Sequence, residues 1–329
     1  QKDTAFADAH CMPNVLTMPK PWHKETQGPI QDMLHIYFKG EATNHQKEEI
    51  MGCFELMQNA DSLGSIMKFN INEGTRLLIK QTTDYWCSQE IVPEEVRTQI
   101  DTFKLILALT EKYHALVMNP PYMGRSGMND LITQYVRDNY ALGKWDLFAT
   151  FMLVAINRLE INAKMSMINM HSWMFLDAFD ALRMYFVKNF QIDNMLHLGP
   201  NTFDELSGEV VQNTTFVISK NRPNHAGDYY KLSTGNNCAA KEQLFLNDYG
   251  HYRNVNQLRF DTIPSCPIAY WLSINWLKLF GKQSINDIAI SKAGIVSGDD
   301  NYFVKYWHEV CFNPTCSLYA YNSLILKYR

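Results

Sequence analysis

The stretch His114-Ala-Leu-Val-Met-Asn-Pro-Pro-Tyr122 is the part of the chain that most directly indicates a fold. Its first half is a short apolar run rich in strand-forming residues, which predicts a buried, central strand. Its second half ends that strand, because each residue before a proline is pushed towards extended geometry and each proline lacks a backbone donor. We therefore expect a rigid Asn119-Pro120-Pro121-Tyr122 segment at the carboxyl end of the strand, where open α/β sheets bind their ligands. The alternative is an ordinary Pro-Pro turn that closes a strand.

The tetrapeptide Asn119 to Tyr122 also suggests a chemistry. The asparagine side chain and a prolyl backbone carbonyl can both accept hydrogen bonds from one exocyclic amino group. The tyrosine ring offers a face on which a planar base can stack. Together they would form a pocket for a flipped nucleobase, because enzymes that modify a base must extract it from the duplex. This set resembles the catalytic motif of amino-methyltransferases that use S-adenosylmethionine.

Composition sets limits on the class of protein. The chain has 329 residues and is 46% hydrophobic, so we expect a sizeable packed core in one large domain or two modest ones. The net charge of −4 means that the chain as a whole carries no excess of positive charge, so DNA binding would need a locally basic cleft. Seven scattered cysteines indicate reduced thiols in a cytoplasmic protein, with no metal site expected. The longest apolar run, Leu147 to Ile156, is shorter than the roughly 20 residues of a membrane helix, so no membrane association is expected.

Hydrophobic periodicity predicts an alternation of strands and helices along most of the chain. Helices are expected at residues 30–39, 48–58, 130–140, 145–159 and 177–190, with two more within 74–112, and strands at 14–18, 114–118, 164–169, 192–198 and 210–219. This order indicates an α/β fold with a doubly wound sheet and an added edge strand. Residues 221–227 resemble a linker, and the composition then becomes richer in Tyr, Trp and Asn. We therefore expect two domains, residues 1–226 and 227–329.

Four polar residues each have two interpretations. Asp61 lies either in a polar turn after a helix or in a strand-end loop, where it would accept a hydrogen bond from a ligand's amino group. Asp146 lies at the first turn of a helix, where capping is the main expectation and a ligand contact the alternative. His171 and Ser172 leave the end of a predicted strand and are either structural residues or part of the cleft.

These segments together resemble the large adenine-specific DNA methyltransferases of bacteriophage-exclusion (BREX) defence systems, the PglX type. The resemblance covers most of the chain from about Asn59 onward. In the first part it includes Asn119-Pro-Pro-Tyr-Met-Gly124 with Gly127-Met-Asn129, Asp146-Leu-Phe-Ala149 with Phe151-Met152, Met167-Ile-Asn169 with His171-Ser-Trp-Met-Phe-Leu176, and Met195-Leu-His-Leu-Gly-Pro200 with Gly208-Glu-Val-Val-Gln212. In the tail it includes Ile263-Pro264, Pro267-Ile-Ala-Tyr-Trp271, Ser297-Gly-Asp299, Tyr306-Trp307 and Glu309-Val310.

The resemblance implies a Rossmann-like class I methyltransferase sheet, present in part, followed by the start of a mixed α/β target-recognition region. Residues 1–226 would be the carboxyl-terminal part of the catalytic domain, and residues 227–329 the beginning of the DNA-recognition region. The implied activity is transfer of the methyl group of S-adenosylmethionine to N6 of a flipped adenine in double-stranded DNA. Asn119 and the Pro120 carbonyl would bind that nitrogen, Tyr122 would stack on the base, and Asp61 would contact the adenine of the cofactor. Other defence-system proteins are implied as partners.

One departure from the family concerns its glycine-rich cofactor loop. No such loop occurs in this sequence, and it would precede Gln1, so we expect the chain to be a piece of a longer protein. Alternatives to a DNA adenine methyltransferase stay open. The same tetrapeptide occurs in methyltransferases that act on protein glutamine or RNA guanine. A fusion to a nuclease and a non-catalytic DNA-binding or assembly subunit of a defence complex are further alternatives.

Overall fold

The computed structural model describes residues 14–20, 28–203, 211–280, 282 and 287–289, and also the pairing of two short strands near the end of the chain. The chain divides into two compact units, the first ending at Leu279 and the second spanning Phe280–Arg329. In the second unit, β7 (Val304–Lys305) pairs in parallel with β8 (Ile325–Leu326). The sequence motifs at residues 208–210, 297–299 and 306–310 lie outside the described residues. All further description concerns the first unit.

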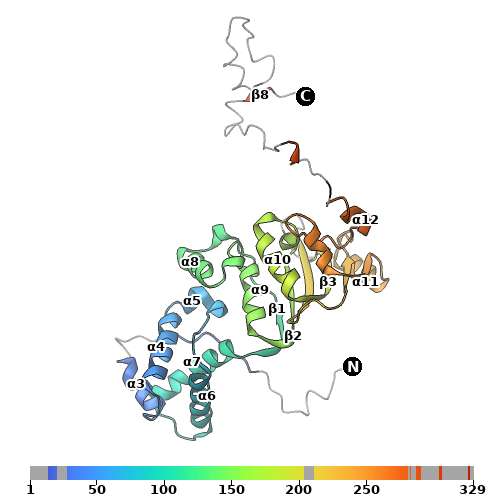
Figure 1. Cartoon of the computed structure of the whole chain (residues 1–329). Helices are drawn as coiled ribbons and strands as arrows, with labels where there is room; N and C mark the ends of the chain where they lie inside the picture. The colour runs from blue at the N-terminus through green and yellow to red at the C-terminus, as the bar shows by residue number, and fades with distance from the viewer. Residues whose placement is uncertain are drawn as a thin grey trace, which may run out of the picture. The chain divides into compact units, whose positions relative to one another are not determined.

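The first unit begins with a group of helices that pack on one another (Figure 1). They are α3 (Ile30–Tyr37), α4 (Asn44–Met57), α6 (Glu73–Ser88) and α7 (Glu94–Thr110). Aromatic rings fill their centre: Tyr37 lies 4.2 Å from Phe103 between ring centroids, and Phe54 contacts Phe103 edge-on. Such pairs stabilise a core beyond the area that they bury. The sequence predicts all four of these helices.

Residues 14–18, predicted as a strand, form no strand in the structure. Two prolines bound this stretch, and an apolar pentapeptide becomes a strand only where a neighbouring strand satisfies its backbone. Helix α4 begins earlier than the apolar spacing indicates. Thr43 and Gln46 form a reciprocal capping box at its start, and this polar signal precedes the first apolar residue.

The sheet has six strands in the order β1-β2-β4-β3-β5-β6. Their bounds are β1 (Tyr113–Met118), β2 (Leu159–Met170), β3 (Gln191–Gly199), β4 (Asn213–Ser219), β5 (Gly227–Lys231) and β6 (His251–Val255). Strand β1 is parallel to β2, and β3 is parallel to β5. Strand β4 is antiparallel to both of its neighbours, as β6 is to β5. This mixed sheet confirms the predicted α/β class with a Rossmann-like sheet.

Two strands occupy positions that differ from the prediction. Strand β1 was expected at the centre of the sheet but lies at its edge among the described residues, and Val117 is 83% exposed. The apolar composition of β1 suits burial on both faces and does not reveal how many neighbours the strand has. The strand predicted at residues 210–219 was expected at an edge, whereas β4 lies between β2 and β3 and pairs with both. Sequence adjacency predicts that β3 and β4 pair but not on which side.

Three helices connect the first strands of the sheet along the chain. They are α8 (Asp130–Asn139), α9 (Leu147–Arg158) and α10 (Asp180–Asn189), and α9 and α10 pack on the sheet (Figure 1). Nine of the twelve residues of α9 are buried, as its nearly continuous apolar sequence predicts. Asn129 caps α8 by accepting a hydrogen bond from the Ile132 backbone N–H at 2.8 Å.

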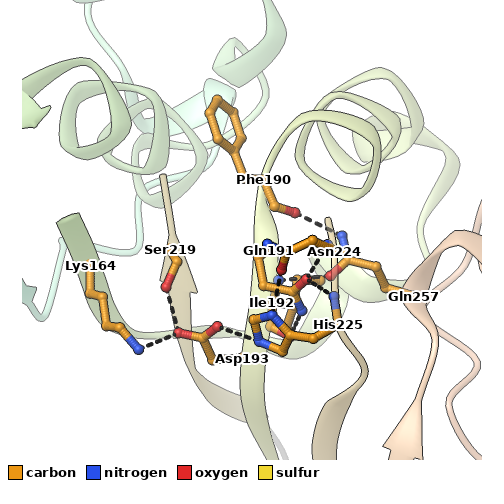
Figure 2. A network of polar contacts seen from close by, with 9 residues as sticks. All are labelled: Lys164, Phe190, Gln191, Ile192, Asp193, Ser219, Asn224, His225 and Gln257. Atoms are coloured by element: carbon orange, nitrogen blue, oxygen red, sulfur yellow. Dashed lines mark hydrogen bonds and ion pairs between the residues drawn. The ribbon is translucent and has the colours of Figure 1, made fainter. Parts of the chain in front are cut away.

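The chain after residue 226 continues the same sheet. Figure 2 shows why the connection is firm: the Asp193 carboxylate at the amino end of β3 bonds Lys164 at 2.8 Å, the Ser219 hydroxyl at 2.6 Å and the His225 ring at 3.2 Å. It therefore joins β2, β3, β4 and the segment that leads into β5. The compact unit accordingly ends near residue 279, about fifty residues beyond the predicted boundary at 226/227.

A second group of contacts fastens later residues to β3. The Gln257 side chain accepts a hydrogen bond from the Ile192 N–H at 2.7 Å and donates to the Phe190 carbonyl (Figure 2). It also donates to the Val187 carbonyl at 2.7 Å. Gln257 belongs to the 3₁₀ helix η6 (Gln257–Thr262), which packs against α10. The assignment of residues 227–329 to target recognition stays a prediction.

Candidate functional site

The carboxyl ends of β1, β2 and β3 and the amino end of β4 meet at one edge of the sheet. This follows from the pairing, because β4 runs antiparallel to β2 and β3, and β1 runs parallel to β2. The edge therefore brings together the Asn119–Tyr122 segment after β1, His171 and Ser172 after β2, and Asn213 at the start of β4. Residues far apart in the sequence become neighbours where α/β sheets bind ligands.

The Asn119–Tyr122 segment leaves β1 with its asparagine exposed. Asn119 and Pro121 are exposed, Pro120 is buried and Tyr122 is half-buried. The Tyr122 hydroxyl donates to the Ile168 carbonyl at 3.1 Å, and its ring meets Phe148 edge-on at 6.4 Å between centroids. Burial raises the pKa of Tyr122, so the hydroxyl remains a donor at neutral pH. The ring is thus anchored to β2 while the asparagine amide stays accessible.

Asn213 is a site residue that the sequence analysis did not single out. It is fully buried, and its side-chain amide donates to the Tyr122 hydroxyl at 3.0 Å. Asn169, at the end of β2, is fully buried as well, and the Oδ1 atoms of Asn169 and Asn213 have no hydrogen-bond partner among the described residues. Buried polar groups without partners are rare and concentrate at functional sites. The available signal was an asparagine near the end of β2 and another at the start of β4.

Asp146 fastens the loop that follows Tyr122 to α9. Its Oδ1 accepts hydrogen bonds from the backbone N–H groups of Phe148 and Met123, each at 3.1 Å. The first contact caps α9, as one of the two interpretations expects, and the second holds the residue after Tyr122. Burial raises the pKa of Asp146, and the backbone donors partly offset this. Asp146 therefore supports the site through the backbone of the loop.

His171, which is half-buried, forms a pair with the buried His197. Its Nδ1 lies 2.9 Å from Nε2 of His197 on β3, and its ring meets Phe175 edge-on. Its backbone N–H donates to the Gln212 carbonyl at 2.7 Å, which ties the end of β2 to the start of β4. Ser172 is half-buried, and its hydroxyl forms no hydrogen bond with the described residues. Both residues lie at the same edge of the sheet as the Asn119–Tyr122 segment, and their part in a ligand cleft stays a prediction.

Asp61 lies elsewhere than the functional interpretation requires. It is exposed in the first turn of the short helix α5 (Ala60–Leu63), which directly follows α4 and not a strand. The expected strand-end loop at this position is therefore wrong. The polar run Asn59 to Ser65 can satisfy its backbone either in a turn or in a short helix, and the fold selects the helix. A contact of Asp61 with the cofactor stays a prediction.

Two classes of feature do not occur in the part of the chain that the structure describes. No cluster of three or more His, Cys, Asp or Glu side chains could hold a metal ion there. Within the same ranges, every helix is too short or too polar to cross a membrane.

The mixed sheet, with the Asn-Pro-Pro-Tyr segment directly after β1, defines a Rossmann-like α/β protein of the methyltransferase type. The family model of the Eco57I restriction-modification methylases matches residues 37–203, which is half of the chain and includes every site residue predicted from the sequence. The chain belongs to this family.

Two curated relatives are similar to the chain. The adenine-specific methyltransferase BrxX of Escherichia coli O9:H4 (strain HS) is 36% identical over 219 residues, which cover 65% of this chain and 18% of that protein. The adenine-specific methyltransferase PglX of Lacticaseibacillus casei (strain Zhang) is 36% identical over 213 residues, covering 62% and 18%. The chain thus spans about a fifth of the length of these relatives.

Solved structures are more distant. The chain in the cryoEM structure of a DrdV–DNA complex is 13% identical with a TM-score of 0.41, and the match covers 55% of this chain and 20% of that one. The EcoKI M protein of a type I restriction enzyme is 20% identical with a TM-score of 0.28, covering 37% and 26%. These similarities are too low to bear on the site.

Proposed function

We propose that this chain supplies the amine-binding part of a site-specific, adenine-specific DNA methyltransferase. The observation that carries the proposal is the exposed Asn119 amide beside Pro120 at the ligand-binding edge, on a segment anchored through Tyr122 and Asp146. Membership in a methylase family supports it, and both curated relatives are adenine-specific methyltransferases.

The donor and acceptor chemistry of the site suits an exocyclic amine. The Asn119 side-chain oxygen and the Pro120 carbonyl would each accept one N–H of adenine N6, which turns the nitrogen lone pair away from the base plane. Holding the amine in this way supplies proximity and alignment, the main effects needed for a displacement reaction. The ammonium formed at N6 is acidic and loses its proton without a dedicated base. The Tyr122 ring, held by its hydroxyl, would stack on the base.

S-adenosylmethionine, when bound, supplies an electrophilic methyl group on a sulfonium. The two predicted cofactor contacts are the Asp61 carboxylate and the Asn119 side-chain carbonyl, and both residues are exposed. Acceptors of this kind fit the amino groups of the cofactor. These two residues would therefore form the part of the cofactor site that belongs to this chain.

The wider role follows from the relatives. BrxX and PglX share 36% identity with the chain, so we propose a cytoplasmic phage-defence function in which methylation marks the cell's own double-stranded DNA. Other proteins of the defence system would be its partners. A net charge of −4 implies that DNA contacts depend on a locally basic surface.

Transfer of a labelled methyl group from S-adenosylmethionine to duplex DNA tests the proposal. The assay uses the 329-residue chain and the protein encoded by any longer reading frame that contains it. We expect label on adenine N6 and its loss, by at least about a hundredfold, in Asn119→Ala, because the amine is no longer aligned. Asn189→Ala, the same change at an exposed asparagine at the end of α10, serves as the matched control.

The same assay separates the proposed mechanism from a non-catalytic role and from the other substrate classes. Full activity in Asn119→Ala would contradict the proposed mechanism. DNA binding without any label would favour a non-catalytic DNA-binding or assembly subunit. Label on protein glutamine or on RNA guanine would move the substrate to that class.

A further inference from the structure

Three side chains form a linear hydrogen-bonded series in the interior next to the candidate site. His171 Nδ1 lies 2.9 Å from His197 Nε2, and His197 Nδ1 lies 3.2 Å from the Tyr270 hydroxyl. The three residues come from the end of β2, from β3 and from the segment after η6. His197 is 8% exposed and Tyr270 is 1% exposed, so the inner two members are shielded from water. The proposed function assigns no role to these three side chains.

The direction of the hydrogen bonds can be assigned from the inner end. The Tyr270 hydroxyl has His197 as its only hydrogen-bond partner among the described residues. If the hydroxyl accepted a hydrogen bond from His197, its own O–H would be buried with no acceptor, which is unfavourable. Burial also raises the pKa of Tyr270, so the hydroxyl keeps its proton. Tyr270 therefore donates, and His197 Nδ1 accepts.

The direction of the hydrogen bond between His197 and His171 follows from this assignment. Burial lowers the pKa of His197 to about 4, with His171, Lys231 and Lys241 as further positive influences, so the ring is neutral at pH 7. A neutral imidazole has one N–H, which for His197 must be on Nε2, so His197 donates to His171 Nδ1. Burial lowers the pKa of His171 too. His171 is therefore neutral and carries its proton on Nε2.

The Nε2 atom of His171 is the outermost atom of this hydrogen-bonded series. It has no hydrogen-bond partner among the described residues, and it is not among their buried unpartnered atoms, so solvent or a ligand can reach it. His171 is half-buried at the edge that also holds Asn119. The arrangement presents a neutral N–H donor of fixed tautomer at this edge.

We propose that His171 Nε2–H donates a hydrogen bond to a ring nitrogen of the target adenine, with His197 and Tyr270 as positioning residues that fix the tautomer. This rests on the proposed function. Once Asn119 and Pro120 occupy the N6 amino group, the polar atoms left on adenine are ring nitrogens, which only accept. A neutral donor matches such an acceptor, whereas phosphate would favour a charged imidazole. His171 would thus help to select adenine.

The tautomer can be measured without any methyl transfer. The 329-residue chain is labelled with ¹⁵N at its ten histidines, and ring nitrogens are assigned with the variants His171→Gln and His197→Gln. At pH 7 we expect both rings to be neutral with the proton on Nε2, and we expect Tyr270→Phe to give a mixture of tautomers at His197. A proton on Nδ1 of His171, or an imidazolium there, would overturn the inference.

The contact with adenine is tested in the methyl-transfer assay with four duplexes. One carries adenine at the methylated position, and the others carry 1-deaza-, 3-deaza- or 7-deazaadenine, each lacking one ring acceptor. On adenine, His171→Leu should lower kcat/KM by about three- to tenfold, the range for one neutral hydrogen bond, and His171→Gln, which retains a donor, should restore part of it. On one deaza duplex the variant and the wild type should become equal.

An equal loss on all four duplexes, or no loss, would overturn the contact. If the wild-type protein transfers no methyl group to adenine, the contact falls together with the proposed function. In that case the NMR result still reports on the tautomer, so the two failures can be told apart.

Discussion

At the scale of single residues, the site depends on buried polar groups that constrain half-buried ones. Tyr122 is held by Ile168 and Asn213, and His171 by His197. The outer member of each set lies at the edge of the sheet that holds Asn119, and the side chains of Asn213 and His197 are buried. Such supporting contacts hold reactive groups in a productive geometry.

His197 should make the stability of the protein sensitive to acid. Its folded-state pKa is about 4 and its ordinary value about 6.5, so the unfolded chain binds a proton first as pH falls. Its contribution is therefore complete above pH 6.5 and is lost between pH 6.5 and 4, on the order of 3 kcal/mol at most. Thermal unfolding across this range should show a shallower pH dependence for His197→Gln than for the wild type.

Carboxylates also titrate in this range, so the informative quantity is the difference between the two proteins. Parallel melting-temperature curves for the wild type and His197→Gln from pH 7 to 4 would contradict the expected burial of a neutral imidazole.

At the scale of elements, hydrogen bonds fasten α9 and the loop after Tyr122 to each other. The Asp146 carboxylate caps the helix and holds Met123, and backbone bonds join Leu147 to the Met123 carbonyl and Arg125 to the Trp145 carbonyl. A buried, nearly uniformly apolar helix therefore positions a polar loop. Asp146, which caps the helix, contacts both the helix and the loop.

We expect Asp146→Ala to cost about 1–2 kcal/mol of unfolding free energy, the usual value of a lost N-cap, and also to reduce methyl transfer because the loop loses its anchor. Chemical denaturation and the methyl-transfer assay measure the two effects. Asn237→Ala is the control, since Asn237 caps α11 (Cys238–Leu246) through the Ala240 N–H without touching the loop. Equal activity loss in both variants would mean that stability alone is responsible.

At the scale of the whole first unit, the residues after 226 are integral to the sheet. Strand β5 pairs with β3, and Gly227 comes so close to β3 that an added Cβ would lie 2.4 Å from the Ile192 carbonyl oxygen. Tyr270 and Phe260, both buried, complete the core on this side. The sheet cannot be separated from this part of the chain without exposing its interior.

Gly227→Ala should therefore destabilise the entire unit in a single transition, by about 1–3 kcal/mol, because backbone must shift to admit the methyl group. Gly52→Ala is the matched control. Gly52 lies in α4 with no atom within 4 Å of an added Cβ, so this change should stabilise the helix by about 0.5–1 kcal/mol. Urea unfolding measures both. Loss of β5 and β6 alone, with the rest of the sheet intact, would contradict a single unit.

The sequence by itself determined the features that depend on neighbouring residues. The end of β1 at Asn119-Pro-Pro, the cap at Asn129 and the buried helix α9 follow from backbone restriction, side-chain capping and apolar periodicity. The tetrapeptide and the accompanying motifs also pointed to the methylase family. Each of these signals is contained in a few consecutive residues.

Only the tertiary structure decided which distant groups meet. The insertion of β4 between β2 and β3, the exposed edge of β1, the helical setting of Asp61 and the His171–His197–Tyr270 chain all depend on pairing across the fold. An apolar strand is compatible with several neighbours, and a buried polar side chain acquires its partner only when the strands are in register. The physical reason is that strand order and polar pairing are settled by long-range packing, which local residue preferences do not encode.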